Sequence, residues 1–277
     1  MKHRDAEKLL EQVWTQARPC FTEPTSTNPA STPSGMAWES SGNQSINDLE
    51  EYFWGSATRF AILVSLLDRY LSHGARVLDA GAGHGLLAAA IQKAGFSAKA
   101  CDLHQGLNIF DSLNIPYQPW NLEAEGAPYV DNHFDAVVLS QTIEHFTYSV
   151  RHPLEELIRI TKPGGLMLID APNISCFRNT SRLLRGKSLH WDFKENYLKQ
   201  EPVIVNGIPY YDRHNHEYCM QDMRDIASYF QLELVEARYY SSYNQHKHGR
   251  FSVFASQLRD MVPHWRKALY AVFRLSS

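Results

Sequence analysis

The sequence contains few cysteines, and their positions exclude two classes of small fold. The four cysteines are Cys20, Cys101, Cys176 and Cys219, which lie far apart and form no Cys-x-x-Cys pair. Neither a zinc knuckle nor a disulfide scaffold has this pattern. Reduced thiols are typical of cytosolic proteins, so we expect a cytoplasmic protein.

An excess of positive charge and long apolar runs are also missing. Lys and Arg number 27 against 30 for Asp and Glu, which gives a formal net charge of −3. A mildly acidic chain lacks the overall basic footprint of a nucleic-acid-binding protein, so no nucleic-acid partner is expected. No apolar signal core begins the sequence, and no stretch approaches the roughly 20 apolar residues that a transmembrane helix needs.

The patterns that are present predict one large α/β domain. Short apolar runs alternate with helical stretches, which is the signature of a parallel sheet with helices on both faces. We expect strands at residues 76–80, 98–102, 134–140 and 166–171, with helices at 86–94 and 153–161 between them. The apolar run at 136–139 is what a strand covered on both faces requires.

The segments on either side of this alternation predict further parts of the domain. Helical spacing favours helices at 4–17, 47–72 and 220–230, two strands at 232–240 and 250–256, and a closing helix at 257–274. Residues 20–46 have the composition of a flexible arm, which could act as a lid. We therefore divide the chain into an N-terminal helix with its arm (1–48), a core (49–172), a substrate-side insertion (173–217) and the C-terminal part of the core (218–277).

The strongest motif is a glycine-rich turn between a predicted strand and a predicted helix. Residues 77–85 run from an apolar strand into Gly81, Gly83 and Gly85, a turn that suits a nucleotide-like ligand at the carboxyl edge of the sheet. Leu86 stands where the dinucleotide fingerprint requires its third glycine, and no Lys followed by Ser or Thr forms a phosphate-binding loop. Asp79, two residues before Gly81, fits a cationic amino-acid end better than a pyrophosphate.

A second acidic residue follows at the end of the next predicted strand. Asp102 lies about 20 positions beyond the glycine turn, where a carboxylate can accept hydrogen bonds from both ribose hydroxyls. The pairing of this residue with the glycine turn favours a binding role over that of an ordinary carboxylate at the end of a strand.

Four ordered motifs resemble those of class I S-adenosylmethionine-dependent methyltransferases. Residues 77–85 resemble motif I, 132–138 the fourth strand with its lead-in, 142–146 the segment after that strand in small-molecule members, and 159–165 the turn before the fifth strand. The resemblance implies a Rossmann-like sheet of seven mostly parallel strands with an insertion after the fifth. It also implies that S-adenosylmethionine is the cofactor and S-adenosylhomocysteine the product.

The resemblance implies individual roles around the methionine part of the cofactor. The backbone of the glycine turn would border the methionine part and the ribose, and Asp79 would organise the turn and the cofactor's amino group. The turn residues given this role are Gly81, Ala82, Gly83 and Gly85. Ser140 and Gln141 would lie beside the methionine part, and Tyr52 and Arg59 could close over its carboxylate.

Further roles are implied around the ribose and the adenine. Asp102 would bind the ribose hydroxyls, and Leu103 would pack on the adenine. Asn121 and Leu122 would sit at the adenine edge. The family often has Asp where this chain has Asn121, but the Asn amide can still donate to and accept from an adenine.

Three residues are candidates for contact with the methyl acceptor. Methyl transfer from a sulfonium needs mainly the alignment of the acceptor, and a hydroxyl acceptor also needs a base such as histidine. His145 follows the fourth strand, where the substrate of the family faces the cofactor, and Glu144 could contact substrate or pair with a cation. His214 resembles the His of a His-x-x-Glu-Tyr stretch in methyltransferases encoded with glycan biosynthesis.

No metal site is expected from the sequence. The possible ligands His214, His216, Cys219, His246 and His248 lack an arrangement of carboxylates around them, and histidines separated by one residue in a loop are weak metal motifs. Solvated loop histidines explain the pattern more simply.

Several functions and partners stay open at this level. We expect O-methylation of a small-molecule acceptor, with a sugar hydroxyl favoured over a lipid or quinone-like acceptor, and a non-catalytic cofactor-binding module as a further alternative. The predicted C-terminal helix carries basic and apolar residues. It favours packing onto its own domain or onto a homodimer partner over peripheral membrane contact.

Overall fold

A central seven-stranded sheet organises the computed structural model of this chain. The structure describes residues 3–21, 46–103, 107–189, 193–205, 207–211, 213–241, 256 and 258–276. The strand order is β3-β2-β1-β4-β5-β9-β8, with β1 to β5 parallel and β9 antiparallel to both of its neighbours. The strands are β1 Arg76–Ala80, β2 Ser97–Asp102, β3 Tyr117–Pro119, β4 Phe134–Ser140, β5 Thr161–Pro172, β8 Glu233–Tyr240 and β9 Ala268–Arg274. The predicted Rossmann-like, mostly parallel sheet is confirmed.

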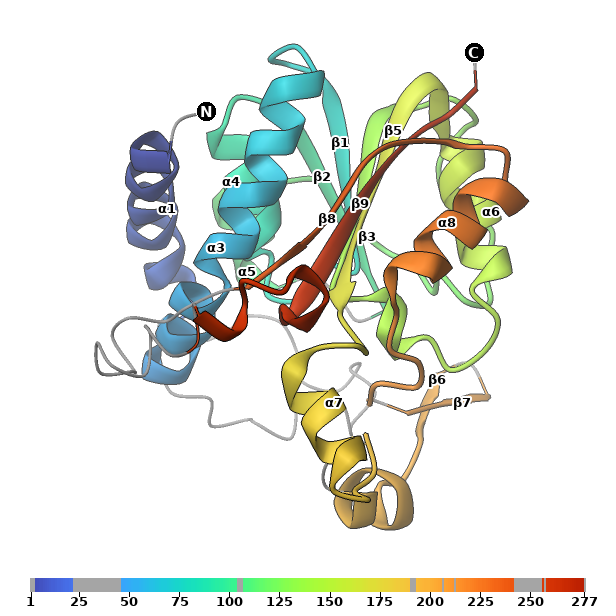
Figure 1. The fold of residues 1–277 in the computed structure, drawn as a ribbon. Helices are drawn as coiled ribbons and strands as arrows, with labels where there is room; N and C mark the ends of the chain where they lie inside the picture. Colours follow the sequence, from blue (N-terminus) through green and yellow to red (C-terminus); the bar gives the residue numbers. More distant parts are fainter. Residues whose placement is uncertain are drawn as a thin grey trace.

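Helices cover both faces of this sheet (Figure 1). One face carries α1 His3–Ala17, α3 Ile46–Tyr70, α4 Leu86–Lys93 and α5 Asn108–Ser112, and the other carries α6 Arg151–Ile160 and α8 Met220–Tyr229. Successive strand residues belong to opposite faces, so Val138 packs with the first group and Val137 and Leu139 with the second. This arrangement explains why the middle of β4 has no polar residue.

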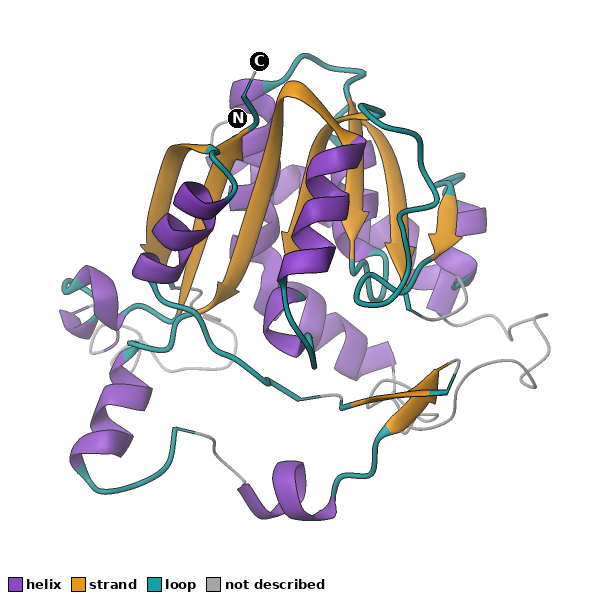
Figure 2. Ribbon diagram, turned by 90° about the vertical axis from the view of Figure 1, so that its right-hand side faces the viewer, coloured by secondary structure: helices purple, strands orange, loops and turns teal. Residues whose placement is uncertain are grey.

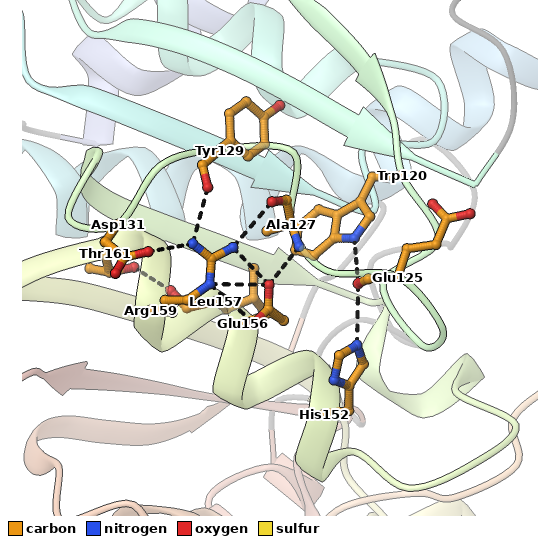
Figure 3. Close-up of polar contacts among 10 residues, drawn as sticks. All are labelled: Trp120, Glu125, Ala127, Tyr129, Asp131, His152, Glu156, Leu157, Arg159 and Thr161. Carbon is orange, nitrogen blue, oxygen red and sulfur yellow. Dashed lines mark hydrogen bonds and ion pairs between the residues drawn. The ribbon is translucent and has the colours of Figure 1, made fainter.

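Arg159 fastens α6 to the loop that leads into β4 (Figure 3). Its guanidinium donates to Asp131 Oδ1 at 2.5 Å, Glu156 Oε2 at 2.8 Å and the Ala127 carbonyl at 3.1 Å. The same Glu156 oxygen accepts the Ala127 N–H at 2.5 Å. Because several bonds converge on one side chain, residues 127–131, which lead into the start of β4, are held by the helix next to them.

The insertion after β5 lies beyond the carboxyl ends of the parallel strands (Figure 2). It contains α7 Phe177–Leu184, the π-helical turn η4 Lys194–Lys199 and a two-stranded hairpin of β6 Val203–Val205 and β7 Ile208–Tyr210. The chain re-enters the main domain at Tyr218, which forms an isolated bridge with Asn173. The insertion therefore stands over the sheet edge where the glycine turn ends.

The predicted closing helix at 257–274 is wrong. Most of its second half is β9, which lies between β5 and β8, and a short 3₁₀ turn, η5 Pro263–Trp265, precedes it. Leu269, Ala271 and Phe273 join one core cluster and Tyr270 and Val272 the other, a period of two that only a strand produces. Residues 258–274 therefore do not form the amphipathic helix that the possible membrane contact required.

Two other expectations fall mainly on residues outside the described ranges. They are the flexible arm at 20–46, of which the structure describes 20, 21 and 46, and the strand at 250–256, of which it describes residue 256 alone, in a helical conformation. Among the described helices, none is both long and apolar enough to cross a membrane. Two further 3₁₀ turns among the described residues are η1 Arg18–Phe21 and η3 Ile143–His145.

Candidate functional site

The glycine turn after β1 combines close packing with open space. Gly81, Gly83 and Gly85 all have positive φ, at 78°, 50° and 74°. A Cβ on Gly81 would lie 2.3 Å from Thr142, and one on Gly85 would lie 2.8 Å from Phe110, whereas a Cβ on Gly83 would meet no described atom within 4 Å. Gly81 and Gly85 are therefore required for packing, and Gly83 leaves room for a ligand.

Two cavities meet at this turn, and their linings share Gly81, Gly83 and Gln141. The smaller cavity is also lined by Tyr52 and Arg59 of α3, Asp79 of β1, Leu86 and Leu87 of α4, Ala82 and His84 of the turn itself, and Ser140. The larger cavity is lined on one side by Asp102, Leu103, Asn121 and Leu122, and on the other by Thr142, His145, Phe146, Val203, Tyr210 and Tyr211. The site thus suits an elongated ligand with two chemically different ends.

The smaller cavity carries the charges that an α-amino acid would need. Asp79 is buried, its Oδ2 meets no hydrogen-bond donor among the described residues, and burial raises its pKa to about 7. Arg59 donates to Tyr52 Oη at 3.1 Å and Ser56 Oγ at 3.0 Å. Burial opposes its charge, yet Tyr52 and Asp170 raise the pKa of Arg59. An ammonium group would satisfy Asp79, and a carboxylate would satisfy Arg59.

Asp102, at the end of β2, lines the larger cavity beside the glycine turn. Its Oδ2 accepts the Gly83 N–H at 2.7 Å, and its Oδ1 accepts the Leu103 N–H at 2.6 Å. These bonds fix the carboxylate beside the glycine turn, where the resemblance implies a ribose contact. That role stays a prediction.

The other residues expected near the adenine line the larger cavity. Leu103 and Leu122 supply its apolar side. The Asn121 amide donates from Nδ2 to Tyr210 Oη at 2.8 Å, and its Oδ1 accepts the Glu123 N–H at 3.2 Å. Asn121 therefore joins the core to the β6–β7 hairpin, a role that the sequence did not predict.

A buried carboxylate that the sequence analysis missed supports the floor of the smaller cavity. Asp170 of β5 accepts hydrogen bonds from Ser140 Oγ at 3.1 Å and Gln141 Nε2 at 3.2 Å, and a short one from Tyr240. Burial raises its pKa, although Arg59 acts in the opposite direction. Gln141 has a φ of 52°, a strained conformation for a residue with a side chain, as is common at ligand sites. The sequence signal that could have identified Asp170 is its position directly after the apolar run 166–169.

The three predicted acceptor-contact residues come together in the structure. One potential ligand atom of each of Glu144, His145 and His214 lies within 4.8 Å of the other two, and the two imidazole rings are 5.0 Å apart and nearly perpendicular. Asn215 joins the two segments, because its N–H donates to the Glu144 carbonyl at 2.8 Å and its Nδ2 to the His145 carbonyl at 3.0 Å. This Glu–His–His cluster (Glu144, His145 and His214) is built from residues about 70 positions apart.

The members of the cluster differ in their surroundings. His145 lines the larger cavity, whereas Glu144 is fully buried, and burial raises its pKa to about 8. His214 Nδ1 lies 3.5 Å from Glu217 Oε1, and this hydrogen bond raises the pKa of His214. Of the three, only His145 lines the larger cavity, so Glu144 and His214 do not border it directly.

Other histidines from the sequence analysis do not join this cluster. His216 is exposed and packs against the ring of Tyr218, with centroids 4.7 Å apart. His246 and His248 lie outside the described residues.

Comparisons with known proteins identify the family of this chain. A family model described as a methyltransferase domain matches residues 55–237. A demethylmenaquinone methyltransferase of Paenarthrobacter aurescens is 32% identical over 131 residues, which are 45% of this chain and 51% of that protein. One of Corynebacterium efficiens is 34% identical over 102 residues, 36% of this chain and 42% of that protein. This chain thus matches about half the length of these relatives.

Solved structures share the fold. A methyltransferase in complex with the Trm112 methyltransferase activator of Haloferax volcanii superposes with a TM-score of 0.59 and 15% identity, over 87% of this chain and 97% of that one. A SAM-dependent methyltransferase of Archaeoglobus fulgidus gives a TM-score of 0.51 and 13% identity, over 81% of this chain and 99% of that one. At these identities the likeness concerns the fold.

Proposed function

Since the chain belongs to the methyltransferase-domain family and its cofactor is S-adenosylmethionine, we propose that it methylates a hydroxylated aromatic, quinone-like acceptor. The observation that carries the proposal is the larger cavity. It joins the glycine turn to an aromatic wall formed by Phe146, Tyr210 and Tyr211. In the reaction, the methyl carbon leaves the sulfonium sulfur and bonds to the acceptor oxygen, the hydroxyl proton is released, and S-adenosylhomocysteine remains.

The residues of the two cavities fit the cofactor's functional groups. Asp79 and Arg59 face the smaller cavity with charges opposite to those of an ammonium and a carboxylate. Asp102 borders the glycine turn with a carboxylate that suits ribose hydroxyls. The acceptor would then enter between the turn and the aromatic wall, with His145 at its polar end and His214 next to that histidine.

The aromatic wall favours a flat acceptor over a sugar. Aromatic rings stack on planar apolar groups over a large area, and Val203 and Leu122 extend the apolar lining. The two relatives described above are named for a demethylated menaquinone, a quinone. A sugar, which also stacks on aromatic rings, is the second acceptor to be tested.

The experiment uses S-adenosylmethionine labelled in its methyl group and three separate acceptor pools: hydroquinones, nucleotide sugars and phospholipids. Label in the hydroquinones supports the proposal, and label confined to the sugars or lipids contradicts it. If the cofactor binds but no pool is labelled, the alternative of a non-catalytic module is favoured.

A pair of phenylalanine variants tests the aromatic wall. Phe146→Ala removes a ring that lines the larger cavity, so we expect the KM for the hydroquinone to rise at least tenfold while the Kd of S-adenosylhomocysteine changes little. Phe177→Ala on α7 is the control, because this ring is partly exposed and lines neither cavity. Equal kinetic effects of the two substitutions would contradict the assigned wall.

A further inference from the structure

The Glu–His–His cluster has the composition of a metal site. Two imidazoles and one carboxylate supply nitrogen and oxygen donors that suit divalent first-row ions. Their potential ligand atoms lie within 4.8 Å of one another, a separation that small side-chain movements would reduce to the spacing around a bound ion. A bare ion of this type is smaller than a water molecule, so the burial of Glu144 does not prevent it from fitting between the three side chains.

A bound cation would stabilise the buried carboxylate of Glu144. Neither side-chain oxygen of this fully buried residue meets a hydrogen-bond donor of another described residue. A buried polar group without a partner is costly, and a buried carboxylate especially so. Asp170, another buried acid of this site, accepts hydrogen bonds from Ser140, Gln141 and Tyr240. Glu144 therefore differs from Asp170 in a way that a bound cation would explain.

One ring nitrogen of His214 contacts a carboxylate, as is typical of histidines that bind a metal with the other nitrogen. Its Nδ1 lies 3.5 Å from Glu217 Oε1, and Asn179 Nδ2 donates to Glu217 Oε2 at 2.7 Å. Histidines that bind metals with one ring nitrogen usually donate from the other to a carboxylate, which fixes the orientation of the ring. Here the Glu217 contact leaves Nε2 of His214 as the nitrogen available to the cluster.

We propose that Glu144, His145 and His214 bind a divalent first-row metal ion, such as zinc, manganese or cobalt, beside the acceptor cavity. Because His145 lines that cavity, the remaining coordination positions would face it and accept water or an oxygen atom of the acceptor. The binding itself does not depend on the proposed function. The role in holding an acceptor hydroxyl rests on that function.

Cobalt binding to the full, tag-free, chelator-treated chain tests the site. The visible absorption of Co²⁺ reports ligands of the protein, and Zn²⁺ is then added as a competitor. We expect one equivalent to bind, and Glu144→Gln and His214→Ala to weaken that binding at least tenfold. Glu217→Gln, which alters only the group that orients His214, should weaken it roughly tenfold to a hundredfold.

His216→Ala is the matched control for the cobalt titration. It removes a histidine of the same loop that is exposed and outside the cluster, so cobalt binding should not change. The affinity for S-adenosylhomocysteine, measured in every variant, shows that the fold is retained. The inference is overturned if wild-type protein binds no cobalt, or if His214→Ala and His216→Ala have equal effects.

The two proposals fail separately in these experiments. Methyl transfer to a hydroquinone by protein that binds no cobalt would leave the function standing and remove the metal site. Cobalt binding that depends on His214, without methyl transfer to any acceptor, would support the metal site and contradict the proposed function.

Discussion

At the residue scale, the glycines of the turn after β1 have separate physical roles, and Gly83 is the one with open space around it. Replacing Gly83 by Ala places a methyl group in open cavity space at a φ of 50°. We expect the affinity for S-adenosylmethionine, measured by calorimetry, to fall at least tenfold, because the methyl group occupies ligand volume. The backbone strain should cost about 1–2 kcal/mol of stability.

Gly74→Ala is the matched control for the turn. Gly74 also has positive φ and open space around it, but it is exposed and borders neither cavity. It should lose similar stability and keep its affinity for the cofactor. Equal losses of affinity in both variants would mean that strain, and not ligand contact, explains the effect at Gly83.

The raised pKa of Asp79 predicts how cofactor binding depends on pH. Burial disfavours the carboxylate in the folded protein, so Asp79 reduces stability once the pH exceeds its unfolded pKa, and the full cost is present above about pH 7. An ammonium ligand pairs with the charged form. The affinity for S-adenosylhomocysteine should therefore rise up to about tenfold per pH unit as the pH increases toward 7, and then level off.

The Asp79→Asn variant isolates this titration. The amide has no charge to offer the ammonium, so calorimetry between pH 5.5 and 8 should show weaker binding and a flatter profile. The variant should be at least as stable as the wild type at pH 8, because a buried carboxylate is removed. Identical pH profiles for the two proteins would exclude Asp79 as the titrating group.

Most residues around the cofactor cavities could be predicted from the sequence, because local motifs specify them. Asp79 and Asp102 lie at the ends of β1 and β2, and the glycines directly follow β1, so all of them meet at one sheet edge. The contacts of Asp170 with Ser140 and Tyr240, and of Asn121 with Tyr210, could not be predicted. They join segments brought together by the strand order and by the hairpin, which no local pattern encodes.

At the element scale, the C-terminal strand shows where periodicity misleads. The strands β1, β2 and β4 were predictable because each is an apolar run followed by a turn. In the last segment, apolar residues at 258, 261, 265, 269 and 272 imitate helical spacing, although the first ones precede β9 and only the last belong to it. The short elements α5, β3, β6 and β7 were missed because each has too few residues to show a periodic pattern of apolar residues.

Two substitutions distinguish the strand from the helix. In a helix, Met261 and Val272 would share one buried face, since they are about three turns apart. In the structure Met261 is 71% exposed and Val272 is fully buried in β9. Val272→Asp should therefore lower the free energy of unfolding, measured in urea, by about 3–5 kcal/mol or more, and Met261→Asp should change it by less than about 0.5 kcal/mol. Similar losses for both would favour the helix.

At the scale of the whole molecule, the glycine turn divides a single ligand site into two chemically different cavities. The smaller cavity holds the charged side chains Asp79 and Arg59, and the larger one holds the apolar and aromatic wall. Leu86, buried at the start of α4, occupies the place of the glycine that a dinucleotide would need. A ligand should therefore stabilise the fold fully only if it fills both cavities and carries no pyrophosphate.

Thermal unfolding with three ligands tests this division. S-adenosylhomocysteine, which has both an adenosine and an amino-acid end, should at a hundred times its Kd stabilise the protein by about 2.7 kcal/mol and raise Tm by roughly 5–8 °C. Methylthioadenosine, which lacks the amino-acid end, should at the same concentration give less than half that shift, because it leaves Asp79 and Arg59 unpaired with a ligand. NAD should give none. Equal shifts with the first two ligands would mean that the smaller cavity contributes nothing to binding, and a shift with NAD would remove the argument from Leu86.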